Sequence, residues 1–212
     1  MMEMSCPPGR RAARKADRRR AIIEVAERSF LEHGYAATSM STIAAELGGS
    51  KTTLWSYFPS KEELFSAVLD SKIANFQEAL DEALIPAGGT EAALTRFGRI
   101  LLAKVLMPES AALHRLIVGE AERFPAIGQA FATRGPDRVR ARLCRYMAEE
   151  MAAGRLREGE PMLAARQFVA LCQAGCYLDR LWRPGCTLIA DPDAEVAAAV
   201  CTFLAGWAAE SG

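Results

Sequence analysis

Apolar residues recur at steps of three and four along almost the whole chain, which is the spacing of one face of an α-helix. No alternation of apolar and polar residues bounded by turn residues persists, so the pattern predicts an all-α protein. The clearest stripe predicts one helix over 61–84, roughly 35 Å long at about 1.5 Å per residue. Its apolar positions are Leu64, Phe65, Val68, Leu69, Ile73, Phe76 and Leu80.

Two short helices joined by a tight turn are predicted within 38–61. Ser39 is a suitable N-cap for the first helix, and Gly48 and Gly49 suit its end because glycine adopts positive φ. Ser50 suits the cap of a second helix over 51–58. The buried face of the first helix is predicted to hold Ile43, Ala44 and Leu47.

The second short helix ends before Pro59, and Ser60 with Glu63 forms a capping box that starts the helix 61–84. Leu54 and Phe58 are predicted to face the core. The outer face carries hydrogen-bond donors and amphipathic rings, as a helix that reads the DNA major groove does. These residues are Lys51, Thr52, Thr53, Trp55, Ser56 and Tyr57. The alternative is a solvated surface helix followed by a loop.

Further helices are predicted over 18–32, 91–107, 111–123, 125–133 and 137–153, and the breaker-rich run 85–90 is predicted to separate two parts of the chain. A single long helix is predicted from Pro161 to Trp182, with one narrow polar stripe. That stripe is formed by Arg166, Gln173 and Arg180.

A final helix is predicted over 192–209, with Asp191 as its N-cap and Pro192 at its first position. One side carries large apolar residues and the other carries alanines and Cys201. If one side faces the chain's own core and the other meets a second copy, the last two helices form a four-helix bundle across a two-fold axis. The alternative is a monomer with a buried C-terminal hairpin.

Charge is distributed unevenly along the 212 residues, although the formal net charge is zero. Residues 10–20 hold seven basic residues and one acidic residue, a net charge of +6, and this basic arm can contact phosphates or a minor groove. The alternative is a solvated, disordered tail. The N-terminus has no apolar signal region and no run is long enough to span a membrane, so we expect a cytoplasmic protein without membrane contact.

Six cysteines and two histidines bound the candidate chemistry. No CxxC motif occurs, so neither a metal site nor a cofactor is expected. Cys172 and Cys176 share a helix face and are predicted to be small core residues; the alternative is a thiol-based sensor. No catalytic set of residues and no phosphate-binding glycine loop appears, so the sequence predicts no enzyme.

The segment from Ile22 to Leu64 resembles the DNA-binding domain of the TetR (tetracycline-repressor-type) family of transcriptional regulators. The matching residues are Ala26, Phe30, Gly34, Tyr35, Thr38, Ile43, Ala44, Gly48, Ser50, Thr53, Leu54, Tyr57, Phe58, Lys61, Glu62 and Leu64. The chain departs from the family at Ser41, Gly49, Thr52, Trp55 and Ser56, several of which lie on the groove-facing side.

The resemblance implies a set of DNA contacts. The implied phosphate contacts are Ser39, Ser50, Lys51, Thr53, Tyr57 and Lys61, and the implied residues nearest the bases are Thr52, Trp55 and Ser56. Ser41, where a basic residue is frequent in the family, is included as a DNA-binding candidate. The partner implied is a palindromic operator in double-stranded DNA, bound by a homodimer.

The second part of the chain resembles the C-terminal domain of AefR-like regulators around 115–139. This implies a pocket for a hydrophobic or cationic effector, which releases the DNA from a repressor. The pocket candidates are Phe97, Leu101, Leu116, Glu120, Phe124, Phe131, Met147, Phe168 and Cys172. The dimer-interface candidates are Phe168, Cys172, Cys176, Val200, Phe203, Leu204 and Trp207. The alternative is a ligand-independent or thiol-responsive DNA-binding dimer.

The expected organisation therefore has four parts along the chain. They are a disordered basic arm over 1–17, a helix-turn-helix domain over 18–60, a connecting helix over 61–84 and a ligand-binding and dimerisation domain over 85–212.

Overall fold

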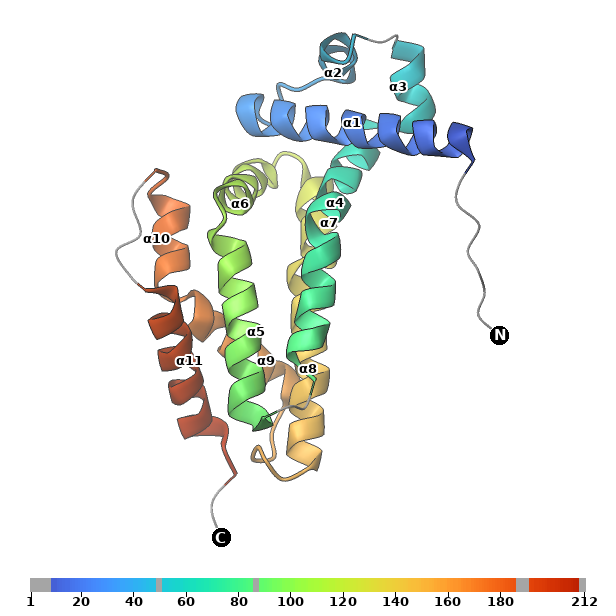
Figure 1. Cartoon of the computed structure of the whole chain (residues 1–212). Helices are drawn as coiled ribbons and strands as arrows, with labels where there is room; N and C mark the ends of the chain where they lie inside the picture. Colours follow the sequence, from blue (N-terminus) through green and yellow to red (C-terminus); the bar gives the residue numbers. More distant parts are fainter. Residues whose placement is uncertain (1–8, 49–50, 86–87, 186–190, 210–212) are drawn as a thin grey trace. The chain divides into compact units, whose positions relative to one another are not determined.

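The computed structural model describes residues 9–48, 51–85, 88–185 and 191–209, and over these ranges the protein is all-α, as predicted (Figure 1). None of the helices in these ranges combines the length and the apolar character that crossing a bilayer requires. The helices are α1 (Arg10–His33), α2 (Met40–Glu46), α3 (Lys51–Tyr57), α4 (Lys61–Ala83), α5 (Gly89–Leu106), α6 (Pro108–Glu120), α7 (Pro125–Arg134), α8 (Pro136–Ala152), α9 (Pro161–Gln173), α10 (Cys176–Trp182) and α11 (Pro192–Trp207).

The chain divides into two compact units, Met1–Ser71 and Lys72–Gly212, and the division falls inside α4. The early turns of α4 belong to the first unit, whereas later turns contact α8 of the second, where Arg142 donates to Asp81 at 2.9 Å. The sequence placed the boundary at 85–90, because helix breakers gather there. Those breakers end the helix, and the unit boundary lies upstream because α4 supplies residues to two cores.

The first unit is built around three aromatic rings from α1, the turn after it and α4. The ring centroids of Phe30, Tyr35 and Phe65 lie 5.2–5.5 Å apart, and all three side chains are buried. Edge-to-face and offset stacked contacts of this kind add to the free energy of area burial. Ile43 of α2 and Leu54 of α3 are buried as well, so both short helices depend on this unit's core for their stability.

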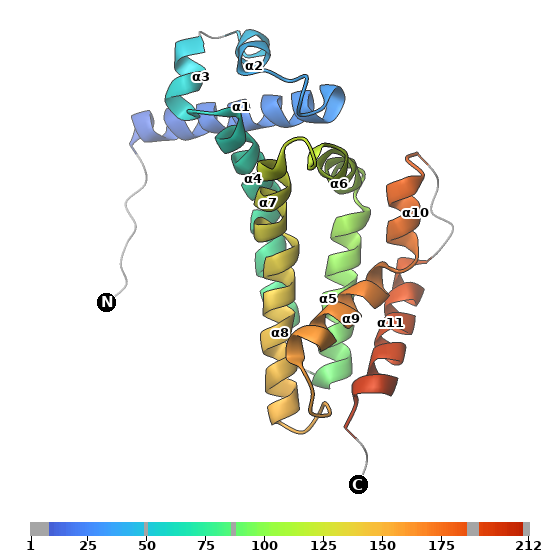
Figure 2. The same cartoon turned by 180° about the vertical axis from the view of Figure 1, so that it is seen from behind.

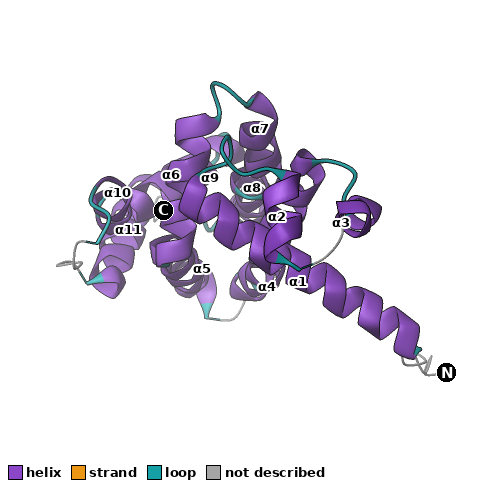
Figure 3. Ribbon diagram, turned by 90° about the horizontal axis from the view of Figure 1, so that it is seen from above, coloured by secondary structure: helices purple, strands orange, loops and turns teal. Residues whose placement is uncertain are grey.

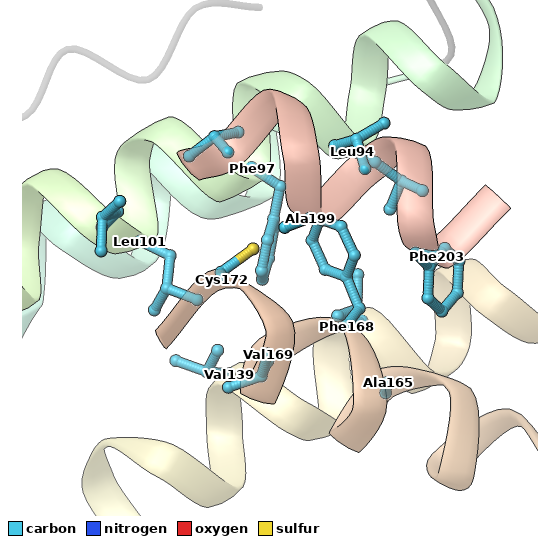
Figure 4. Packing of buried hydrophobic residues seen from close by; sticks show 14 of the residues in the cluster. Leu94, Phe97, Leu101, Val139, Ala165, Phe168, Val169, Cys172, Ala199 and Phe203 are labelled. Carbon is cyan, nitrogen blue, oxygen red and sulfur yellow. The ribbon is translucent and has the colours of Figure 1, made fainter. Parts of the chain in front are cut away.

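The second unit buries the facing sides of α5, α8, α9 and α11, and α9 packs against α5, α8 and α11 (Figure 2). Phe168 of α9 lies at the centre, with its ring 6.3 Å from Phe97 and 5.2 Å from Phe203 between ring centroids (Figure 4). Near the C-terminus an isolated β-bridge joins Leu156 and Ala208. A core of aromatic and aliphatic side chains from four helices therefore holds this unit together.

Among the described residues of the second unit, one charged side chain is buried. Glu150, at 3% exposure, accepts hydrogen bonds from the guanidinium of Arg155 at 2.7 and 2.8 Å and from the hydroxyl of Thr90. The hydrogen bonds from Arg155 lower the pKa of the Glu150 carboxyl, against the opposing effect of burial. The network ties the end of α8 to the first turn of α5.

α1 begins at Arg10, eight residues before the predicted start, so residues 10–17 are helical and not the disordered arm that the charge count suggested. The physical reason is helix propensity: this stretch is made of arginine, lysine and alanine, which are strong helix formers, and Asp17. Arg20 also donates to Asp17 at 2.8 Å across one turn. Residues 1–8 of the predicted arm lie outside the described residues.

The predicted helix 161–182 is two helices, α9 and α10, which are separated at Ala174 and Gly175. Gly175 adopts φ −107° and ψ −104°, outside the helical region. Both carboxylate oxygens of Glu195 accept from the Cys176 backbone N–H, at 2.9 and 3.0 Å. Periodicity alone missed this break because the apolar pattern continues through it, and the capping carboxylate comes from α11, far along the sequence.

Candidate nucleic-acid interface

The turn between α1 and α2 is fixed by buried hydroxyl groups. Thr38 is 2% exposed and its hydroxyl lies 2.8 Å from the Gly34 carbonyl oxygen and 3.0 Å from the Ser29 carbonyl oxygen. Ser39 follows as the N-cap of α2, and its side chain accepts from the Thr42 N–H at 3.1 Å, as the sequence predicts. These contacts set where α2 begins.

Lys61 secures the same turn from the start of α4. Its ammonium donates to the Tyr35 carbonyl at 2.6 Å and to the Thr38 carbonyl at 2.9 Å, and it lies 4.1 Å from the centroid of the Tyr35 ring. A charged donor that serves two backbone acceptors is a strong local restraint. The structure therefore gives Lys61 a positioning role, which the family resemblance did not suggest.

α3 has one buried face and one exposed face, as predicted. Leu54 and Phe58 are buried at 2% and 3% exposure, and they hold the helix against the first unit's core. The indole of Trp55 is 47% exposed, and Tyr57 is half-buried at the edge of the outer face. The other outward side chains, Lys51, Thr52, Thr53 and Ser56, are exposed. The Ser56 hydroxyl donates to the Thr53 carbonyl at 2.7 Å, so its oxygen remains open as an acceptor.

The other DNA-binding candidates lie around α2. Ser39 and Ser41 are both exposed, although the Ser39 hydroxyl is already engaged as a cap. Gly48 has a φ of +60°, the left-handed conformation expected for a residue that ends a helix. Ser50 lies outside the described residues. The contact of each of these residues with DNA stays a prediction.

The predicted pocket residues fall into two groups. Phe97, Leu101, Phe168 and Cys172 are buried in the packed core of the second unit (Figure 4), and Met147 belongs to the same core. The second group lies half-buried on α6, α7 and the turn between them and comprises Leu116, Glu120, Phe124 and Phe131. Dense packing around the first group favours a structural role for those side chains.

A stacked group of three rings beside that second set was missed by the sequence reasoning. The His114 ring lies 5.6 Å from Phe131 and 5.8 Å from Tyr177 between ring centroids, and a hydrogen bond joins His114 Nδ1 to the Tyr177 hydroxyl. Burial lowers the pKa of His114 and raises the pKa of Tyr177 to about 12. The sequence did not reveal this group because its three rings come from α6, α7 and α10. The one hint it offered was the scarcity of histidine.

The predicted dimer-interface residues need a correction, because their own chain buries nearly all of them. Phe168, Cys172, Cys176, Val200, Phe203 and Trp207 are at most 5% exposed, and Leu204 is half-buried. The Trp207 indole donates to Gln167 at 2.7 Å and packs beneath the Arg157 guanidinium. The outer face of α11 carries the small residues instead: Ala197, Ala198, Cys201 and Ala205 are exposed.

A short capped helix is followed by a second short helix with an exposed polar face, and both pack on a compact aromatic core. This arrangement defines a helix-turn-helix regulator that binds DNA. Residues 22–68 match the family model for bacterial regulatory proteins, tetR family, and residues 92–209 match the model for the C-terminal domain of AefR-like transcriptional repressors. The chain belongs to the TetR family of transcriptional regulators.

Solved structures agree with this fold over most of the chain. The flavonoid-responsive regulator FrrA is 30% identical with a TM-score of 0.78, and the match covers 92% of this chain and 100% of FrrA. A putative TetR-family transcriptional regulator from Mesorhizobium loti is 28% identical with a TM-score of 0.79, and the match covers 92% of this chain and 98% of that one. A transcriptional regulator of this family is not an enzyme, which agrees with the sequence prediction.

The similarity to curated relatives is confined to part of each chain. The uncharacterized HTH-type regulator YhgD of Bacillus subtilis is 35% identical over 71 residues, which are 34% of this chain and 37% of YhgD. The HTH-type repressor ComR of Escherichia coli is 38% identical over 71 residues, 34% of each chain. The chain therefore spans about a third of the length of these curated relatives.

Proposed function

We propose that this protein is a dimeric repressor that binds a palindromic operator through α3 and releases it when a small hydrophobic or cationic molecule binds to the second unit. The observation that carries the proposal is the outer face of α3. It exposes Lys51, Trp55 and several hydroxyl groups, while Leu54 and Phe58 hold the helix from the other side.

The division of contacts follows from side-chain chemistry and the family motif. Lys51, Thr53 and Tyr57 are assigned to phosphates, and the family motif adds Ser39 and Ser50 to this group. Thr52, Trp55 and Ser56 are assigned to base edges, since hydroxyls accept or donate there and an indole edge contacts a thymine methyl. Lys61 is assigned to positioning, because its ammonium already serves two carbonyls.

Dimerisation is assigned to the outer faces of α9 and α11. Small side chains let two helices approach closely, and the exposed face of α11 carries Ala197, Ala198, Cys201 and Ala205. Leu163 of α9 is 47% exposed and adds apolar area. A two-fold axis through these helices gives a four-helix bundle, and it pairs two reading helices with a palindromic site whose half-sites lie about 34–36 Å apart.

The effector is assigned to the half-buried residues of α6 and α7. Leu116, Phe124 and Phe131 supply apolar and aromatic surface, and the His114–Tyr177 hydrogen bond supplies a polar group beside it. Glu120 is half-buried on the same helix as His114. Such a set suits a flat, largely apolar molecule with one or two polar groups. FrrA is named as flavonoid-responsive, so flavonoids are the first compounds to test.

The proposal is tested by a binding selection on randomised duplexes, followed by anisotropy titration of the recovered operator. We expect a palindrome, two protomers per duplex and loss of binding when an effector from a flavonoid and cationic-amphiphile panel is added. The Lys51→Ala variant is expected to retain its fold and lose most of its affinity, because Lys51 is exposed. Operator binding that is indifferent to every compound would favour a ligand-independent regulator instead.

The thiol-responsive alternative is disfavoured by the surroundings of the two central cysteines. Burial raises the pKa of the Cys172 thiol to about 12, and burial together with the Glu195 carboxylate raises the pKa of Cys176 to about 11. Because the thiolate is the reactive form, both groups are held in the inert state at neutral pH.

A further inference from the structure

The first two turns of α1 form a helix with no packing partner in the described part of the chain. Residues 11–17 are all exposed, whereas from Ile22 onward α1 buries a regular series of side chains. In Figures 1 and 3 this end of α1 reaches beyond α3. A helix end that buries nothing adds little to folding stability, so its composition is free to serve a different purpose.

The basic residues of this extension gather on one side of the helix. At 3.6 residues per turn, Arg11, Arg14, Lys15 and Arg18 fall within an arc of about 100°. We call these four residues the α1 basic stripe. The alanines at 12, 13 and 16 occupy the opposite side, and the one acidic residue, Asp17, is paired with Arg20 away from the stripe.

The stripe lies on the side of α1 that turns toward the helix-turn-helix. Arg11, Lys15 and Arg18 follow the same line along the helix as Ile22 and Ser29, at steps of four, three, four and seven. Ile22 and Ser29 are buried, and the backbone of Ser29 accepts from Thr38 at the turn into α2.

Arg19 gives a direct link to the reading helix. It lies next to the stripe along α1, and its guanidinium is 5.1 Å from the centroid of the Phe58 ring, directly after α3. The line of α1 that packs against the helix-turn-helix therefore becomes basic where the helix extends past it.

We propose that the α1 basic stripe is a second DNA-contact surface, which binds the phosphate backbone of the same duplex whose major groove α3 enters. The proposal rests on the function proposed above. From Arg11 to Arg18 the stripe is about 10 Å long, and about 10 Å of duplex carries about six phosphate charges. The stripe contributes affinity and salt dependence without sequence information, because long basic side chains on phosphates read no bases.

Repulsion between the like charges of the α1 basic stripe supports the phosphate backbone as its partner. Arg11 and Lys15 are four residues apart, as are Arg14 and Arg18, and like charges at this spacing destabilise an isolated helix. Phosphates that lie against the stripe remove the repulsion. DNA binding is therefore expected to stabilise the first turns of α1, which appears as increased protection of the 10–18 amides from hydrogen exchange.

The test compares a stripe variant with a matched control at a series of salt concentrations. The stripe variant carries Arg11→Gln, Arg14→Gln and Lys15→Gln, and it leaves the half-buried Arg18 in place. The control makes the same change of charge at three exposed arginines of the second unit, through Arg138→Gln, Arg145→Gln and Arg183→Gln. Full-length protein is titrated against the selected operator and against a random duplex.

The stripe variant is expected to bind roughly tenfold or more weakly at moderate salt. The slope of log K against log salt should fall by about 0.9 for each phosphate that the substitutions leave without a basic partner. Its base preferences are expected to match those of the wild type, and the control is expected to keep the wild-type slope. An unchanged slope in the stripe variant overturns the proposal. Changed base preferences overturn it as well, since they would assign these residues to a groove.

One more measurement distinguishes DNA from an anionic membrane as the partner of the α1 basic stripe. The proposal fails if the wild-type protein binds phosphatidylglycerol vesicles, the stripe variant does not, and both show the same salt slope of DNA binding. In that case the α1 basic stripe binds a lipid surface. Titration against the random duplex distinguishes failure of the proposed operator-binding function from failure of the proposed phosphate contact. A wild-type protein without any operator preference contradicts the proposed function, whereas the difference in salt slope alone decides the stripe.

Discussion

Replacing Lys61 by methionine separates two roles that the sequence and the structure give to this residue. The family resemblance implies a phosphate contact, whereas the structure shows its ammonium donating to the carbonyls of Tyr35 and Thr38. Methionine keeps much of the aliphatic side chain and removes the charge. Lys61→Met therefore tests whether the ammonium fixes the turn into α2 or serves the DNA.

The expected cost comes from the two hydrogen bonds. A hydrogen bond from a charged donor contributes about 1.5–3 kcal/mol, and the part-buried position of Lys61 favours the lower end, so losing both costs about 2–4 kcal/mol. The cation–π contact with the Tyr35 ring adds at most about 1 kcal/mol at a site of this exposure. For a unit of this size the midpoint of thermal unfolding should fall by roughly 10 °C or more.

The assay pairs thermal unfolding with the salt dependence of operator binding, and Lys51→Met is the control. Lys51 is exposed on α3, so its loss should leave stability within about 0.5 kcal/mol and should lower the salt slope by about 0.9 per protomer. Lys61→Met should show the reverse pattern when binding is measured well below its unfolding midpoint. An unchanged unfolding midpoint with a reduced salt slope would refute the positioning role of Lys61.

Three further outcomes are expected in the second unit. Gly175→Ala should destabilise it by about 1–2 kcal/mol in urea unfolding, because a Cβ would displace the capping Glu195 carboxylate, and Glu195→Ala should make that change nearly neutral. Folding lowers the pKa of the Glu150 carboxyl, so the stability that this group contributes is fully present above its ordinary pKa of 4.5 and is lost as the pH falls below that value. In an acid titration, the stability of the Glu150→Gln variant should therefore decline less steeply than that of the wild type. In alkylation with iodoacetamide followed by mass spectrometry, the half-buried Cys144, which lies outside the proposed dimer face, should react before the buried Cys172, and equal rates would contradict the assigned burial.

Local signals in the sequence predicted several helix starts correctly. Ser39 caps α2, Ser60 accepts from the Glu63 N–H at 3.1 Å to start α4, and Asp191 caps α11. Each of these depends on residues a few positions apart, which a sequence displays directly. The same holds for Leu54 and Phe58, whose burial follows from helical spacing alone.

Features that depend on distant residues were missed. The break before α10 is stabilised by Glu195, nineteen residues beyond Cys176, and the stacked rings of His114 and Tyr177 lie sixty-three residues apart. The large side chains of α11 were predicted to form the dimer interface, because side-chain size does not show which of two apolar sides of a helix faces the chain's own core. The structure shows that the large side, with Phe203, packs inward.

Parallel binding selections test whether the outer face of α3 reads DNA bases. Wild-type protein and the Thr52→Ala and Ser56→Ala variants are each selected against the same randomised duplex library at one salt concentration. We expect each variant to recover a related palindrome with altered preference at one or two base pairs per half-site. Identical motifs and preferences for all three proteins, with only a common change in affinity, would contradict the assignment of α3 as the reading helix.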